Sequence, residues 1–160
     1  MKNIKDIIEE YYLELSLLTV FARTEHNIHR KEYETIKLHN LTPMQFGVLE
    51  ALYMKGSLTI GQLMEKNLST SGNMTVVIRN LERDRLIKKT VSLEDKRVTL
   101  ISLTEDGKNQ IEKILPKHYE NVYTIFSELT TDEKQLFKEI LKKVSYSIQD
   151  NNVKNKCVTK

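Results

Sequence analysis

The chain has 160 residues, 39% hydrophobic and 29% charged, which is long enough for one globular domain with a real core and too short for two comfortable ones. Its net charge of only +3 excludes a generally polybasic nucleic-acid binder, so any DNA-binding surface must come from where the charges lie. The single cysteine, Cys157, excludes an intramolecular disulfide framework. The chain starts with the acidic segment MKNIKDIIEEYYLE and has no long apolar run, so we expect a cytoplasmic protein without a signal peptide or a membrane span.

The segment from Ile4 to Ile36 contains neither proline nor glycine and is predicted to form one long helix. Along it an apolar stripe recurs at alternating spacings of four and three residues: Ile4, Ile8, Tyr11, Leu15, Leu18 and Ala22. This spacing is typical of a helix that packs against another helix. Because the rest of a small domain cannot cover so long a surface, we expect a second copy of the chain to cover it in a homodimer.

Two short helices are predicted next, each opened by the same capping sequence. Segments 42–45 and 59–62 both have the Thr-x-x-Gln spacing at which the two side chains cap a helix start. We expect the first helix to stop at Gly56 and the second to end at Asn67.

A third helix is predicted to begin within Ser69-Thr70-Ser71, with Met74, Val77, Ile78 and Leu81 as its core stripe. No Asp or Glu occurs from Ser69 to Asn80, so the backbone N–H groups and the positive dipole end are left for a DNA phosphate. Side chains of the types that bind phosphates, base edges or a thymine methyl fill this segment, and we predict DNA contacts from Ser69, Thr70, Ser71, Asn73, Thr75, Val76 and Arg79.

After Leu86 the apolar period changes to two, which predicts a two-stranded hairpin over 87–91 and 98–103. Its tip carries Arg97, an arginine suited to the narrow, negative minor groove, and Asp95, which is placed to hold the guanidinium by a bidentate pair. We predict DNA contacts from Asp95, Lys96 and Arg97. A short helix, a turn, a second helix and a hairpin together indicate a winged helix-turn-helix.

The remaining chain is predicted to form two helices, the first capped by Thr104 and kinked or broken at Pro116, the second running to Ile148. The expected fold is mostly α-helical with a small β-hairpin wing. We expect one domain over 1–148, with dimerisation helices at about 4–36 and 104–148, a DNA-binding lobe at about 42–103, and a disordered polar tail over 149–160.

The helix order, the segment SGNMTVVIRNLER, the tip EDKR and the following LTEDG resemble the MarR family of bacterial transcription regulators over essentially the whole chain up to the tail. The resemblance implies a homodimer, joined by its terminal helices, that binds a pseudo-palindromic operator and usually represses. It places Ser71, Asn73, Thr75, Val76 and Arg79 on the recognition helix, and Arg97, oriented by Asp95, in the minor groove. Many members release DNA when a small phenolic or other amphipathic ligand binds between the dimerisation helices and the DNA-binding lobe.

The chain departs from the family at two places. The glycine usual before the Leu-Ile of the wing is Arg85 here, so we expect the recognition helix to end in another way, at Asp84. Peroxide-sensing members carry a reactive cysteine near the start of the first helix, and this chain has none there, which argues against that oxidation switch.

Two other functions are compatible with parts of the sequence, and a third, catalysis, is not. His26 and His29 have the spacing of two metal ligands, with Glu25, His39 or His118 to complete a set, as in a metal-responsive regulator; polar helix surface is the simpler interpretation. A winged-helix module that binds proteins instead of DNA is opposed by the acid-free reading face. Neither a serine-nucleophile motif, a phosphate-cradling loop nor HExxH occurs, so we expect no enzymatic activity and no cofactor.

Overall fold

The chain starts with two helices, α1 (Ile4–Glu10) and α2 (Tyr12–Ile36), where one was predicted. This is a computed structural model that describes residues 3–158, with side chains described for 3–149. Tyr11 separates the two helices, with φ −107° and ψ 19°. Two adjacent aromatic residues, Tyr11 and Tyr12, lose side-chain freedom in a helix, which makes this a weak point in the segment.

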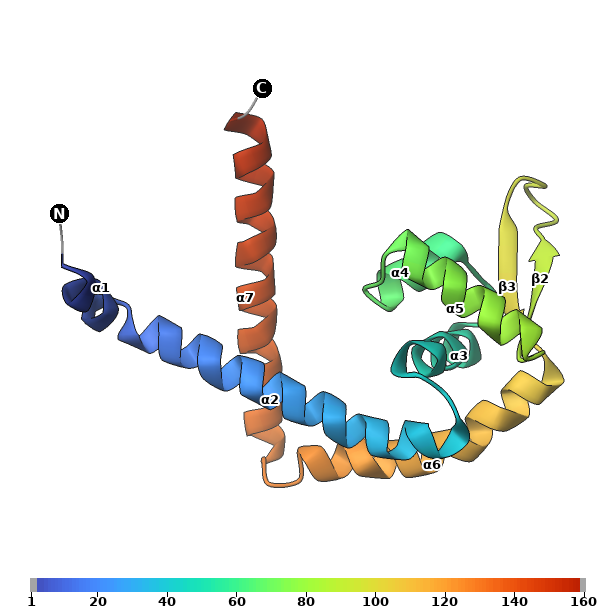
Figure 1. Cartoon of the computed structure of the whole chain (residues 1–160), viewed down its shortest axis with the longest axis horizontal. Helices are drawn as coiled ribbons and strands as arrows, with labels where there is room; N and C mark the ends of the chain where they lie inside the picture. Colours follow the sequence, from blue (N-terminus) through green and yellow to red (C-terminus); the bar gives the residue numbers. More distant parts are fainter. Residues whose placement is uncertain (1–2, 159–160) are drawn as a thin grey trace. The chain divides into compact units, whose positions relative to one another are not determined.

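The predicted DNA-binding lobe follows the short 3-10 helix η1 (Lys37–His39) and contains three helices and a small sheet, drawn in Figure 1. Its elements are α3 (Pro43–Lys55), β1 (Leu58–Thr59), α4 (Ile60–Lys66), α5 (Ser71–Arg83), β2 (Ile87–Val91) and β3 (Thr99–Leu103). The sheet is antiparallel in the order β1-β3-β2, so the predicted hairpin has a third strand. Leu58 of β1 pairs with Ile101 of β3.

The predicted helix starts are confirmed in detail. The hydroxyl of Thr42 accepts a hydrogen bond from the N–H of Gln45 at 3.2 Å, and the Gln45 side chain accepts one from the N–H of Thr42 at 2.8 Å. Thr59 and Gln62 form the same reciprocal pair at 3.2 and 2.9 Å. At the other end of α3, Gly56 takes a φ of 76°, a conformation that costs glycine little.

The core lies among α3, α4, α5, β3 and the first half of α6 (Glu105–Ile125). The predicted stripe of α5, Met74, Val77, Ile78 and Leu81, is entirely buried. Of the predicted kink or break at Pro116, the break is wrong, because α6 continues through the proline. The buried side chains on both sides of the proline, Leu115 and His118, pack the helix in place and outweigh the lost hydrogen bond.

Helix α6 is held to α3 by polar contacts as well as by packing. The hydroxyl of Tyr119 donates to Glu50 at 3.1 Å, and that of Tyr53 donates to Glu112 at 3.0 Å, so α3 and α6 exchange two tyrosine–carboxylate bonds. The pKa values of both tyrosines lie above the usual one: burial is the first cause for Tyr119, the hydrogen bond to Glu112 for Tyr53.

A second compact unit begins at Tyr123 and contains α7 (Thr131–Val158). Helix α7 continues from Gln149 to Val158, within the range predicted as a polar tail, and this segment has no proline or glycine to interrupt a helix. The side chain of Cys157 lies outside the described residues. None of the described helices has the length and apolar character needed to span a bilayer.

Candidate nucleic-acid interface

The start of α5 is open to solvent and free of acidic side chains. Thr70 caps the helix, its hydroxyl accepting from the N–H of Asn73 at 3.5 Å, and the first turn contains no Asp or Glu. Ser71, Gly72 and Asn73 are all exposed. The first N–H groups of a helix have no partner within it and carry partial positive charge, so this end can accept a phosphate oxygen.

The outward face of α5 presents the residues that were predicted to read DNA. Val76 is 44% exposed and Arg79 is exposed, on the face opposite the buried stripe. The hydroxyl of Thr75 donates to the carbonyl of Ser71 at 2.8 Å and is partly committed to the helix. Within the described residues Arg79 has no ion pair, so its guanidinium is available to an external anion or base edge.

Farther along α5 the charges are neutralised. Arg83 pairs with Asp84, Nε to Oδ1 at 2.9 Å, and this hydrogen bond raises the pKa of the arginine. Glu82 accepts from Lys89 of β2, Nζ to Oε2 at 2.6 Å. Unpaired positive character on this helix is therefore concentrated at its start and at Arg79.

The end of α5 is built as predicted at Asp84, and in a way that explains how Arg85 replaces the family's glycine. Asp84 is the C-cap, and Arg85 adopts a left-handed φ of 60°. The N–H of Leu86 donates to the carbonyl of Leu81 at 2.9 Å, and that of Arg85 donates to Glu82 at 3.0 Å. These two bonds are a Schellman motif, in which glycine normally occupies the left-handed position.

The first turn of α6 is fastened to this same corner, a contact that sequence reasoning missed. The hydroxyl of Thr104 donates to the carbonyl of Arg85 at 2.6 Å and accepts from the N–H of Gly107 at 3.0 Å. The N–H of Thr104 donates to the carbonyl of Leu86 at 3.1 Å. The sequence contained one signal for this contact, Gly107, which lies three residues after the cap Thr104. A glycine is needed at such a position only when another backbone segment lies very close.

The hairpin tip contains the predicted Asp95–Arg97 pair. Oδ1 of Asp95 accepts from the backbone N–H of Arg97 at 2.9 Å and from its Nε at 3.3 Å. The backbone bond first, and the guanidinium second, lower the pKa of Asp95. The side chain of Arg97 is nevertheless 91% exposed, so it is oriented by the aspartate while remaining open to an external partner. Lys96 beside it is exposed as well.

The histidines do not converge on a metal site. Both ring nitrogens of His29 face carboxylates, Nε2 at 3.0 Å from Glu25 and Nδ1 at 3.2 Å from Glu32. His118 is buried, with Nδ1 3.0 Å from the hydroxyl of Thr35. In the part of the chain that the structure describes, no three His, Cys, Asp or Glu side chains are grouped so as to hold a metal ion, and no third ligand accompanies His26 and His29.

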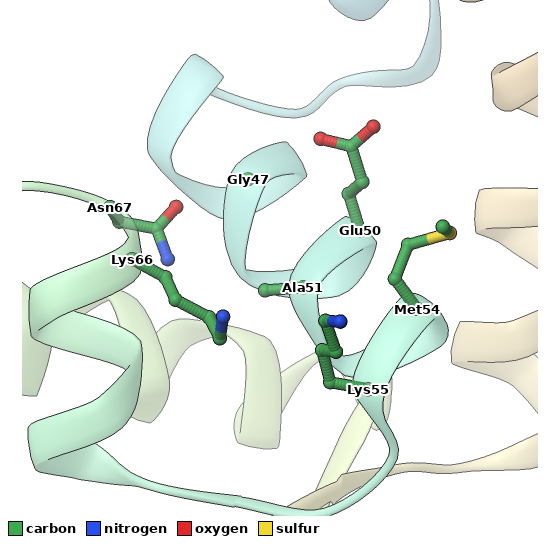
Figure 2. Close-up of a pocket in the computed structure, with 7 residues that line it drawn as sticks. All are labelled: Gly47, Glu50, Ala51, Met54, Lys55, Lys66 and Asn67. Atoms are coloured by element: carbon green, nitrogen blue, oxygen red, sulfur yellow. The ribbon is translucent and has the colours of Figure 1, made fainter. Parts of the chain in front are cut away.

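An open surface cavity of about 320 Å³ lies between α3 and α4. Figure 2 shows its lining residues, which are the small or apolar Gly47, Ala51 and Met54 and the polar Glu50, Lys55, Lys66 and Asn67. Glu50 is engaged by Tyr119, whereas neither lysine has a carboxylate partner among the described side chains. The cavity adjoins the end of α4, just before the turn that leads into α5.

Known proteins similar to this chain are transcription regulators. Residues 30–114 match the family described as transcriptional regulator SarA/Rot. The chain is 35% identical over 130 residues to the HTH-type transcriptional regulator MhqR of Bacillus subtilis, covering 81% of this chain and 90% of that protein. It is 26% identical over 155 residues to the HTH-type transcriptional repressor MdtR of the same organism, covering 97% and 96%. The S. aureus MepR–DNA complex has a TM-score of 0.73 at 26% identity, covering 81% of this chain and 94% of MepR.

Proposed function

Because the chain belongs to the MarR and SarA/Rot group of winged-helix transcription regulators, which are DNA-binding proteins and not enzymes, we propose that it represses transcription by binding a pseudo-palindromic operator as a homodimer. In this proposal α5 enters the major groove and Arg97 enters the adjacent minor groove. The similarity to a repressor, MdtR, over 97% of this chain supports the direction of regulation.

The observation that carries the proposal is the pairing of two exposed cationic elements on one lobe. The acid-free start of α5, with Ser69, Thr70, Ser71 and Asn73, offers N–H groups and short polar side chains for phosphates and bases. Arg97, held by Asp95 but exposed, supplies a guanidinium of fixed direction. Val76 and Arg79 lie about one and two turns farther along the helix, where side chains can reach thymine methyls and guanine edges.

Exposed apolar side chains support the homodimer. Along α1 and α2, Ile4, Ile8, Leu15 and Leu18 of the predicted stripe all lie exposed, as do Ile140 and Val144 of α7. Rows of exposed apolar side chains on a helix favour packing against another helix, and a second copy of the chain offers matching rows. Two recognition helices must then lie about 34–36 Å apart to reach successive major grooves. Sedimentation equilibrium at micromolar concentration should return twice the mass of the chain, and a single-chain mass would overturn this part.

The test of DNA recognition is a selection of bound duplexes from a random pool by the full chain. The proposal expects an enriched inverted repeat whose half-sites are centred about one helical turn apart. Enrichment of no sequence would overturn the proposal and favour the protein-interaction module instead.

We propose further that a small amphipathic molecule releases the DNA, and that the cavity between α3 and α4 receives it. Two unpaired ammonium groups, those of Lys55 and Lys66, beside an apolar wall suit a molecule with an anionic or phenolic head and a hydrophobic body. A molecule bound in this cavity would contact the end of α4. It would therefore act on the turn between α4 and the start of α5.

A panel of phenols and aromatic carboxylates tests the effector site by thermal shift. A compound that stabilises the wild type should lose its effect on Lys66→Met and keep it on the control Lys142→Met, which changes an exposed lysine of α7 that does not line the cavity. Equal stabilisation of all three proteins would place the site elsewhere.

A further inference from the structure

The wing loop between β2 and β3 is closed by backbone hydrogen bonds at its base. The N–H of Ser92 donates to the carbonyl of Val98 at 2.9 Å, and the N–H of Val98 donates to the carbonyl of Asp95 at 2.9 Å. These bonds fix the ends of the loop but do not by themselves fix the residues between Ser92 and Asp95. Leu93, in that interval, is fully exposed and makes no packing contact that would hold it.

The side chain of Ser92 supplies the missing restraint. Its Oγ accepts hydrogen bonds from the N–H groups of two consecutive residues, Glu94 at 3.2 Å and Asp95 at 3.4 Å. Ser92 is half-buried, whereas Glu94, Lys96 and Arg97 are exposed. A serine hydroxyl in this position folds the backbone into a local turn. The second of its donors is the backbone of the residue whose carboxylate holds the arginine.

We infer that Ser92 is a positioning residue for the wing arginine, acting on DNA affinity through Asp95 and Arg97 and not by its own contact with DNA. The restraint passes from the Ser92 hydroxyl to the Asp95 backbone, then from the Asp95 carboxylate to the N–H, Nε and Nη2 of Arg97, the last at 3.5 Å. The inference rests on the proposed function, in which Arg97 reads the minor groove. A pre-oriented guanidinium loses less rotamer freedom on binding than a free one.

Ser92 can play this role because its Oγ is a hydrogen-bond acceptor. With Ser92→Ala the N–H groups of Glu94 and Asp95 turn to water, which costs the folded lobe little at an exposed tip but leaves several loop conformations open. Ser92→Thr keeps the hydroxyl. A matched control is Ser102→Ala on β3 of the same hairpin, whose hydroxyl has no hydrogen bond among the described side chains.

The test measures affinity for the selected operator by fluorescence anisotropy in six full-length proteins: wild type, Ser92→Ala, Ser92→Thr, Ser102→Ala, Arg97→Ala and the double variant Ser92→Ala/Arg97→Ala. Loss of the serine hydroxyl should weaken binding by about 3- to 10-fold, the range of one or two lost hydrogen bonds. The threonine and Ser102 variants should bind like wild type. In the Arg97→Ala background, Ser92→Ala should have no further effect, because the group through which it acts is gone.

The possible results distinguish a failure of the inference about Ser92 from a failure of the proposed function. If Arg97→Ala binds the operator as tightly as the wild type does, the proposed role of Arg97 is overturned. The inference about Ser92 is then overturned as well. If Arg97→Ala weakens binding but Ser92→Ala does not, the proposed function stands and the inference is overturned. Equal losses from Ser92→Ala with and without Arg97 would mean that Ser92 acts on DNA by another route, which also overturns it. As a readout free of DNA, the Nε–Hε NMR signal of Arg97 should move toward the random-coil position in Ser92→Ala and stay in place in Ser92→Thr.

Discussion

A Cβ atom at Gly107 would lie 1.9 Å from the carbonyl oxygen of Leu86, so the first turn of α6 lies directly on the corner where the recognition helix ends. The same carbonyl accepts the N–H of Thr104. Any shift of the start of α6 must therefore move the end of α5 or break this contact. This corner joins the helix proposed to read DNA to the helix that leads toward the second unit.

Gly107→Ala should destabilise the protein, by about 1–3 kcal/mol or more, because the added methyl meets backbone and not a movable side-chain end. Urea unfolding followed by circular dichroism measures this. Gly72→Ala is the matched control, because a Cβ there meets nothing within 4 Å and alanine is the better helix former. Equal unfolding midpoints for the two variants would show that the α6 contact is not as close as described.

Arg85→Gly should stabilise the protein. Arg85 has a φ of 60°, a conformation that an L-residue with a side chain adopts at a cost of about 1 kcal/mol and glycine adopts freely. Arg85→Ala removes the same charge but keeps the Cβ, so it should show no such gain. If both substitutions change the free energy of unfolding equally, the effect comes from the charge and not from the backbone.

Arg97→Ala and Arg79→Ala should both weaken operator binding, by about 5- to 150-fold if each loses a groove contact worth about 1–3 kcal/mol. Arg79→Ala should also relax the sequence preference at one position of each half-site if it contacts a base. Affinity measured at several salt concentrations on matched and mismatched duplexes distinguishes the two roles. Lys142→Ala on α7 serves as a charge control. Binding that is unchanged in Arg79→Ala would remove this residue from the reading face.

The titration of Asp95 should depend on Arg97. Its pKa is lowered first by the backbone N–H of Arg97 and then by the guanidinium. A carboxyl group with a depressed folded-state pKa contributes its ion pair above its usual pKa, and loses it as the pH falls through the lowered value. The wing pair should therefore be intact at neutral pH and open only in acid. In Arg97→Ala the NMR titration midpoint of Asp95 should rise part of the way to normal, because the backbone donor remains; an unchanged midpoint would mean that the guanidinium makes no contribution.

Local sequence signals predicted much of this fold because the interactions they report are local. The two Thr-x-x-Gln starts need only a reach of three residues, and the α5 stripe follows from helical periodicity. The Asp95–Arg97 pair spans two residues and was visible for the same reason.

The misses concern contacts that sequence spacing does not show. Strand β1, Leu58–Thr59, is too short to display a period and exists because it pairs with β3 more than forty positions away, Leu58 against Ile101. Packing of Leu115 and His118 carries α6 through Pro116 against the local preference. Ser92 was passed over because a serine in a loop is ordinary until its hydroxyl is seen to accept two backbone N–H groups.

Hydroxyl-radical and methylation footprinting of the wild type and Arg97→Ala on the selected operator tests the central claim, that α5 reads the major groove and Arg97 the minor groove. For the wild type we expect protected guanine N7 positions in two major grooves one helical turn apart, with protected minor-groove sugars beside each. Arg97→Ala should keep the major-groove protection and lose that of the flanking minor grooves. A wild-type footprint without minor-groove protection, or one identical to that of Arg97→Ala, would contradict it.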